Sequence, residues 1–135
     1  MSNLKIVFTN GCFDILHRGH IELFKYARSL GDKLIVGVDS DDKVQNDKGR
    51  TRPFNCLIDR MEILRSIKYI DEVKSFNVRQ ELEDLIKVVT PDILIVGSDW
   101  RNKEVIGSAF AGEVKFFERI EGYSTTNILE SSLGR

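Results

Sequence analysis

Residues 4–30 read LKIVFTNGCFDILHRGHIELFKYARSL. Leu4 to Thr9 is a short run rich in strand-forming residues, and Asn10-Gly11 interrupts it. From Gly19 to Leu30 the apolar residues recur at helical spacing, and Gly31-Asp32 is typical of a helix end. A strand, a glycine-containing turn and an amphipathic helix in this order predict the first unit of an α/β fold.

The rest of the chain repeats this alternation. Further strands and helices are expected, in chain order, at Lys33–Val38, Leu57–Ile67, Asp71–Ser75, Val78–Val89, Ile93–Val96, Glu113–Phe117 and Thr125–Leu133. Ser40–Cys56 is polar and turn-rich, and we expect a long loop there. We therefore predict one Rossmann-like α/β domain over residues 1–135, with a mostly parallel five-stranded sheet and helices on both faces.

Ligands bind such sheets outside the carboxyl ends of the strands. The segments that follow Thr9, Val38, Val96 and Phe117 should therefore meet at one edge. These segments hold the most unusual sequences of the chain, so the candidate functional site is expected there.

Composition restricts the class of protein. The chain has 135 residues, with 20 Lys and Arg against 21 Asp and Glu, and a formal net charge of -1. This balance argues against non-specific nucleic-acid binding, and the apolar stretches are too short to span a membrane. Without a visible export signal, Cys12 and Cys56 are expected to be reduced thiols of a cytoplasmic protein.

The chain's two histidines, His17 and His20, lie three residues apart at the start of a predicted helix. This spacing places both imidazoles on one face of the helix, where backbone N–H groups and the helix dipole favour an anion. A phosphate site is the favoured interpretation. Zinc binding lacks a third histidine, and simple capping or packing is the structural alternative.

Three further segments carry candidate chemistry. Lys48-Gly49-Arg50-Thr51-Arg52-Pro53, with Arg60 beyond it, is either a phosphate-binding loop or a solvated charged loop. In Gly97-Ser98-Asp99-Trp100, Asp99 is a candidate to bind a hydroxyl or metal, and Trp100 either walls a substrate pocket or covers the core. Arg119 precedes Ser124-Thr125-Thr126, whose hydroxyls open a predicted helix and form a second anion site or an ordinary N-cap.

The string from Gly11 to His20 fits G-x-F-D-x-x-H-x-G-H and resembles the signature of the cytidylyltransferase-like nucleotidyltransferases. The other segments resemble that family's Lys/Arg loop, its Gly-x-Asp-Trp stretch and its R-x-x-G-x-S-T-T element. The resemblance implies that a nucleoside triphosphate gives its nucleotidyl group to a phosphorylated acceptor, and pyrophosphate leaves. The implied catalytic residues are His17, His20, Lys48 and Arg119.

The resemblance also implies the binding residues. Those for the nucleotide are Thr9, Asn10, Gly11, Cys12, Phe13, Asp14, Gly19, Gly97, Asp99, Ser124, Thr125 and Thr126. Those for the acceptor are Arg52, Arg60, Lys68 and Trp100. Mg²⁺ is expected to bind mainly through the substrate phosphates, and a homodimer is a further expectation from the family.

Within the family, residues 10–17, 48–53 and 124–128 look most like the adenylyltransferase domain of ADP-heptose synthases, which favours ATP and a heptose 1-phosphate. Lys68 and Asp99-Trp100 are closer to glycerol-3-phosphate cytidylyltransferases, which use CTP. Two other classes are weighed against an enzyme of this family. One is a nucleotide-binding module without turnover, and the other is a redox protein using Cys12.

Overall fold

The computed structural model describes residues 4–118. The strands are β1 Ile6–Gly11, β2 Lys33–Asp39, β3 Glu72–Phe76, β4 Ile93–Gly97 and β5 Glu113–Phe117. The helices are α1 Arg18–Ser29, α2 Asp41–Lys48, α3 Leu57–Arg65 and α4 Arg79–Val89, with short 3₁₀ turns η1 Ser98–Trp100 and η2 Ser108–Phe110.

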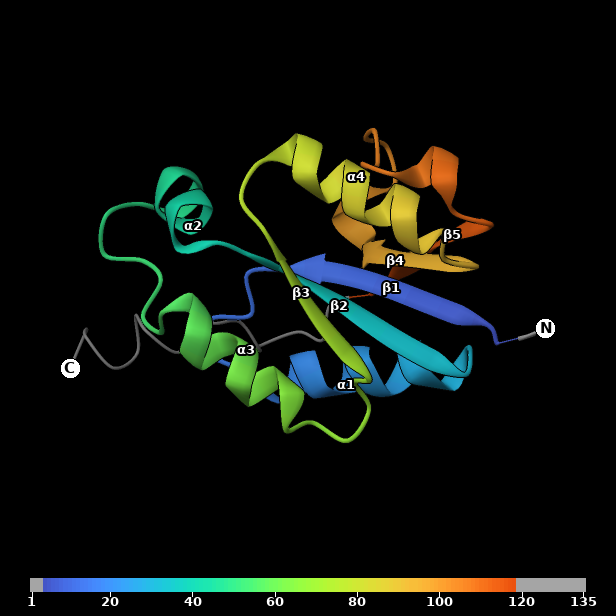
Figure 1. Cartoon of the computed structure of the whole chain (residues 1–135), viewed down its shortest axis with the longest axis horizontal. Coiled ribbons are helices and arrows are strands. Elements are labelled where there is room, and N and C mark those ends of the chain that lie inside the picture. Colours follow the sequence, from blue (N-terminus) through green and yellow to red (C-terminus); the bar gives the residue numbers. More distant parts are fainter. Residues whose placement is uncertain (1–3, 119–135) are drawn as a thin grey trace.

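The strands form one sheet in the order β3-β2-β1-β4-β5, and every pair is parallel (Figure 1). The expected five-stranded α/β fold is therefore confirmed. Strand β1 lies between β2 and β4, so the chain first builds outward on one side of β1 and then on the other. Such a reversal of strand order is the switch point at which doubly wound sheets bind ligands.

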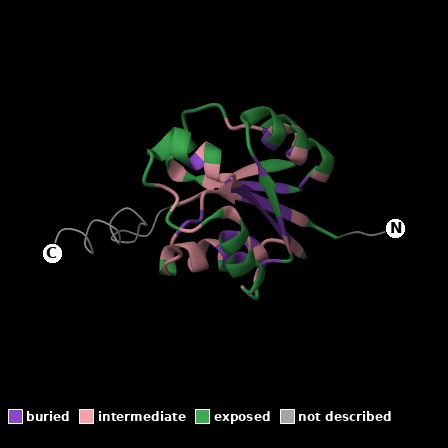
Figure 2. Cartoon of the chain, turned by 60° about the vertical axis from the view of Figure 1, so that its left-hand side comes forward, coloured by how far each residue is buried: buried purple, intermediate pink, exposed green. Residues whose placement is uncertain are grey.

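Two helical layers cover the sheet because neighbouring residues of each strand point to opposite faces. Val7 and Ile93 pack with α1 and α3, whereas Phe8 and Leu94 pack with α4. Figure 1 shows α1 and α3 below the sheet and α4 above it. Buried residues concentrate in the central strands (Figure 2), as expected for a parallel sheet covered on both faces.

The expected loop at residues 40–56 is wrong in its first half, because α2 begins there. The Ser40 hydroxyl accepts a hydrogen bond from the backbone N–H of Lys43 and caps the helix, and acidic residues occupy its first turn. Val44 is the one buried residue of α2. A helix with a single apolar contact leaves no periodic pattern in the sequence. It ends at Gly49, whose φ of 110° favours glycine.

The other expected elements are present with ends shifted by one or two residues. Strand β1 runs to Gly11 because Asn10 and Gly11 pair with Gly37 and Val38 of β2. The helix expected at Thr125–Leu133 lies outside the described residues. No helix within residues 4–118 is long and apolar enough to cross a membrane.

Candidate active site

The loop after β1 is folded tightly onto the core. Phe13 has a positive φ of 49° and is buried, with its ring edge-on to His20 and Phe24. A Cβ at Gly11 would lie 3.0 Å from the tip of the Phe13 ring, a tight contact, so glycine favours this close packing. This arrangement holds the start of α1 at the switch point.

His17 and His20 face each other at the beginning of α1, with ring centroids 4.0 Å apart, as their spacing predicted. Nδ1 of His17, the N-cap residue, accepts from the backbone N–H of Gly19, and Nδ1 of His20 accepts from that of His17. Each neutral ring therefore carries its proton on Nε2. Two ring N–H donors beside a helix N-terminus provide the donors that a phosphate group needs.

Asp14 is a buried lock between this loop and the segment before α3. One carboxylate oxygen accepts from the N–H of Phe54 at 2.6 Å, and the other accepts from that of Asn55 at 2.8 Å. The Nε of Arg52 lies 3.4 Å from the same carboxylate, and the Asn55 side chain donates to the Asp14 carbonyl. Asp14 and Arg52 thus connect the loop after β1 to the 48–53 segment, and both of these segments are candidates for phosphate binding.

Arg60 has a fully buried side chain and joins four segments. Its guanidinium donates to the carbonyls of Cys12, Asp39 and Asn55 and to the carboxylate of Asp41, at 2.7–2.9 Å. These hydrogen bonds all join groups of the protein itself, so Arg60 lies behind the site. It fixes the ends of β1 and β2. The sequence had suggested that Arg60 contacts the acceptor, and its position does not agree with that contact.

Lys48 is the last residue of α2 and is exposed. Its charge acts on Cys12 and on Asp39, so α2 brings this lysine to the carboxyl edge of the sheet. Burial raises the pKa of the Cys12 thiol, although the charges of Lys48 and Arg60 oppose that rise. A thiol that resists ionisation is a poor nucleophile, which argues against the redox alternative.

The segment after β4 lies on the other side of β1. A Cβ at Gly97 would lie 2.6 Å from the Asp99 carboxylate, so glycine lets Asp99 fold back over the strand end. Trp100 is 39% exposed, which leaves one part of its ring available to a ligand. Thr9 is buried and donates to the carbonyl of Ile95 at 2.9 Å, so its hydroxyl ties β1 to β4 beneath the site.

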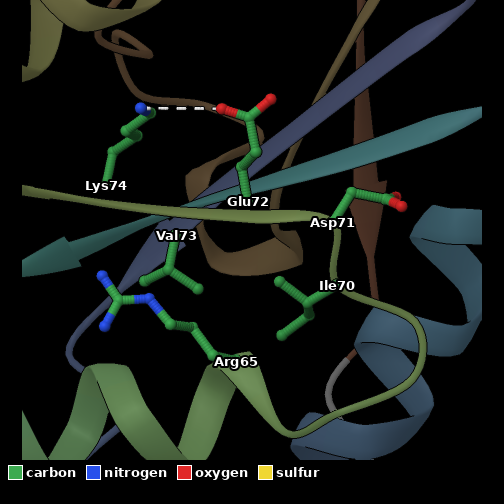
Figure 3. Close-up of a pocket in the computed structure, with 6 residues that line it drawn as sticks. All are labelled: Arg65, Ile70, Asp71, Glu72, Val73 and Lys74. Atoms are coloured by element: carbon green, nitrogen blue, oxygen red, sulfur yellow. Dashed lines mark ion pairs between the residues drawn. The ribbon is translucent and has the colours of Figure 1, made fainter.

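Lys68 lies away from this site. It precedes Asp71, whose N–H donates to the carbonyl of Leu34 at the opposite end of the sheet, where β2 begins. A hollow of about 390 Å³ lies in that region. The residues that line it, drawn in Figure 3, are Arg65, Ile70, Asp71, Glu72, Val73 and Lys74. The suggested contact of Lys68 with an acceptor phosphate at the histidine pair does not agree with this position.

Four site candidates, Arg119, Ser124, Thr125 and Thr126, lie outside the described residues. Within residues 4–118, no group of three His, Cys, Asp or Glu side chains is placed to hold a metal ion. The carboxylate of Asp14 is already occupied by backbone N–H groups and Arg52.

Sequence reasoning missed two residues at this edge. Asn55 forms two hydrogen bonds with Asp14, one through its backbone N–H and one through its side chain. An asparagine in a loop belongs to no periodic pattern, so no signal in the sequence would have identified it. Asp39 ends β2 beside the Cys12 segment. A charged residue directly after the apolar run of residues 34–38 was a signal available in the sequence.

The doubly wound sheet and the histidine pair at its switch point define an α/β protein built to bind a phosphorylated ligand. Residues 8–131 match the family described as Cytidylyltransferase-like, and the chain belongs to that family. The resemblance found in residues 11–20 is therefore confirmed. The description of this family supports nucleotidyl transfer as the class of activity.

Curated relatives include the bifunctional protein HldE of Helicobacter hepaticus, 51% identical over 127 residues, which are 94% of this chain and 26% of the relative. HldE of Marinomonas sp. is 46% identical over 136 residues, covering 98% of this chain and 28% of the relative. The chain thus spans about a quarter of the length of these relatives.

Solved structures are also similar. A lipopolysaccharide core biosynthesis protein from Thermoplasma volcanium matches with a TM-score of 0.70 and 28% identity, over 90% of this chain and all of the other. A pantothenate synthetase from Thermus thermophilus has a TM-score of 0.63 at 14% identity, over 92% of this chain and 61% of the other, and shows the fold alone.

Proposed function

We propose that this protein transfers an adenylyl group from ATP to a sugar 1-phosphate, with D-glycero-D-manno-heptose 1-phosphate as the favoured acceptor. The observation that carries the proposal is the histidine pair, two rings 4.0 Å apart at the switch point of a nucleotide-binding sheet. The HldE relatives and the similarity to a lipopolysaccharide core biosynthesis protein support a sugar acceptor.

In the proposed reaction, a phosphate oxygen of the acceptor attacks the α-phosphorus of ATP in line with the bond to the β-phosphate. That bond breaks, the new P–O bond forms, and pyrophosphate leaves with the bonding electrons. The attacking oxygen is already anionic, so no general base is needed. The task of the protein is to position the phosphates and to stabilise developing charge.

The proposed residue roles are supported by position for the described residues and by the family resemblance for the others. His17 and His20 donate from Nε2 to the α- and β-phosphates, and Lys48 approaches the leaving group from α2. By resemblance, Arg119 stabilises developing charge, and Ser124, Thr125 and Thr126 hold the β/γ end. Mg²⁺ held by the phosphate oxygens would neutralise part of their charge when bound. The cytoplasmic location and the homodimer stay predictions.

A second candidate is a CTP-dependent glycerol-3-phosphate cytidylyltransferase. The partly exposed Trp100 at the carboxyl edge favours it, because a tryptophan wall would narrow the acceptor pocket. Lys68 was one sequence argument for this candidate, but it lies at the opposite edge of the sheet, so that argument no longer applies.

The test is a matrix of four nucleoside triphosphates against sugar and polyol phosphates, read by pyrophosphate release. We expect the highest kcat/KM for ATP with a heptose 1-phosphate. Preference for CTP with glycerol 3-phosphate would establish the second candidate. Nucleotide binding without pyrophosphate release in any combination would establish a binding module.

A further inference from the structure

Asp39, the last residue of β2, has a half-buried carboxylate to which no residue within 4–118 donates a hydrogen bond. Its side chain is only 13% exposed. Within the part of the chain that the structure describes, its nearest cation is the Lys43 ammonium at 3.9 Å, beyond hydrogen-bond distance. That ammonium lies 2.7 Å from Asp47 instead. The carboxylate therefore lies at the sheet edge with oxygens that can still accept a hydrogen bond from a ligand.

This arrangement disfavours folding. A charged group that is partly buried, with no hydrogen bond from the protein, loses hydration that the protein does not replace. Burial raises the pKa of Asp39, and the charge of Asp47 adds to the rise, whereas Lys43, Arg60 and Lys48 oppose it. The ionised form therefore lowers stability above this raised pKa. A ligand hydroxyl that donates to the carboxylate would replace the missing hydrogen bond.

A second polar side chain lies on the neighbouring strand. Asn10 pairs with Gly37, and the alternation of side chains places Asn10, Gly37 and Asp39 on the face that α4 covers. A Cβ at Gly37 would lie 2.9 Å from the Phe8 ring and 3.2 Å from the Cβ of Asn10, so the glycine allows these side chains to pack closely over the strand. The Asn10 amide has no hydrogen-bond partner among residues 4–118. A carboxylate and an amide in this arrangement fit neighbouring hydroxyl groups.

The position of Asp39 indicates which part of a substrate it would meet. A carboxylate repels phosphate, so its ligand is a neutral hydroxyl-bearing group next to the phosphates at His17 and His20. In dinucleotide-binding sheets, a carboxylate that follows the glycine-rich turn hydrogen-bonds the ribose of the nucleotide, which shows that a hydroxyl is a suitable ligand for such a group. Asp99 lies on the β4 side of β1 and Asp39 on the β2 side. A transfer reaction has two substrates, and the two sides of β1 offer a separate binding region for each.

We propose that Asp39, with Asn10 beside it, binds hydroxyl groups of the acceptor and selects a polyhydroxylated sugar phosphate. The proposal rests on the nucleotidyl transfer proposed above. It assigns Asn10, which the family resemblance placed at the nucleotide, to the acceptor side. A site built to hydrogen-bond a hydroxyl discriminates strongly against acceptors that lack it.

The test compares Asp39→Ala with Asp42→Ala, because Asp42 is an exposed carboxylate on α2 without an ion pair or hydrogen bond to the described residues. We expect Asp39→Ala to raise the KM for heptose 1-phosphate about 10- to 100-fold, as for a lost hydrogen bond to a charged group. The KM for ATP should stay unchanged. The Tm should stay equal or rise, because a half-buried charge is removed. Asp42→Ala should change none of these values.

A calorimetric titration of heptose 1-phosphate separates this inference from the proposed function. Absence of pyrophosphate release by the wild type would contradict the function alone. Binding that Asp39→Ala weakens about tenfold or more would still support the acceptor site. Equal affinity of both proteins, or no binding by the wild type, would overturn it. A higher KM for ATP alone would also overturn it, as would a lower Tm of Asp39→Ala.

Discussion

The two edges of the sheet use aspartate in opposite ways. At the amino edge, Asp32, Asp71 and Asp92 directly precede β2, β3 and β4. Each carboxylate accepts the backbone N–H of a residue at the start of a neighbouring strand, at 2.8–2.9 Å, and each backbone N–H donates to the carbonyl of that same residue. At the carboxyl edge, Asp14 binds two backbone N–H groups, but Asp39 binds none within residues 4–118.

The difference separates residues that stabilise the sheet from residues that serve a ligand. The amino-edge carboxylates are exposed, and each accepts a backbone N–H through one oxygen, so each has a structural role within the protein alone. The carboxyl edge contains the histidine pair, Lys48 and Asp39, whose polar groups suit a phosphorylated, hydroxyl-bearing substrate. Asp14 is an exception, because it lies at the ligand edge and has a structural role.

The largest effect is expected from Asp14→Ala, which tests this exception. Removal of the carboxylate leaves the N–H groups of Phe54 and Asn55 unsatisfied and the Arg52 guanidinium unpaired. The loss of one partner of a buried ion pair lowers the free energy of unfolding by about 3–5 kcal/mol. Urea denaturation measures it, with Asp47→Ala as the exposed control. A loss no larger than that of the control would show that Asp14 is not a structural lock.

Replacement of either histidine tests the ligand edge itself. His20→Ala should lower kcat about 10²–10³-fold, because a donor to transition-state charge is lost. His17 caps α1, so His17→Asn is the better variant, since asparagine can still accept the Gly19 N–H. Pyrophosphate release and the Tm are measured together. More than about a third of wild-type turnover in either variant would contradict the assignment.

Lys48→Ala should have a smaller effect. A lost charge-assisted hydrogen bond to phosphate corresponds to about a 10- to 100-fold fall in kcat/KM. Little change in Tm is expected, because Lys48 is exposed at the end of α2. Lys87→Ala, on the last turn of α4, is the matched control and should leave turnover unchanged. Equal activities of the two variants would make the 48–53 segment an ordinary charged loop.

The sequence was sufficient to predict the strands, because apolar runs such as residues 34–38 and 93–96 need burial on both faces. It also located the ligand edge, since glycines and paired histidines followed these runs. It did not predict α2, where capping and one contact of Val44 replace periodicity. It did not separate Thr9 and Arg60, which lie behind the site, from residues that face a ligand. Burial and hydrogen-bond partners decide that distinction, and both depend on segments distant in sequence.

The smallest effect is expected at the amino edge. Asp92→Ala removes the acceptor of the Ile6 N–H at the start of β1, while the backbone hydrogen bond from Asp92 N to the Ile6 carbonyl stays. One exposed hydrogen bond contributes about 1 kcal/mol, which corresponds to a Tm lower by a few degrees. kcat and both KM values should be unchanged, because Asp92 lies at the opposite end of β4 from Asp99. Asp39→Ala is expected to do the reverse, with no loss of Tm and a higher KM for the acceptor. If Asp92→Ala also raised the acceptor KM, the division between a stabilising edge and a ligand edge would fail.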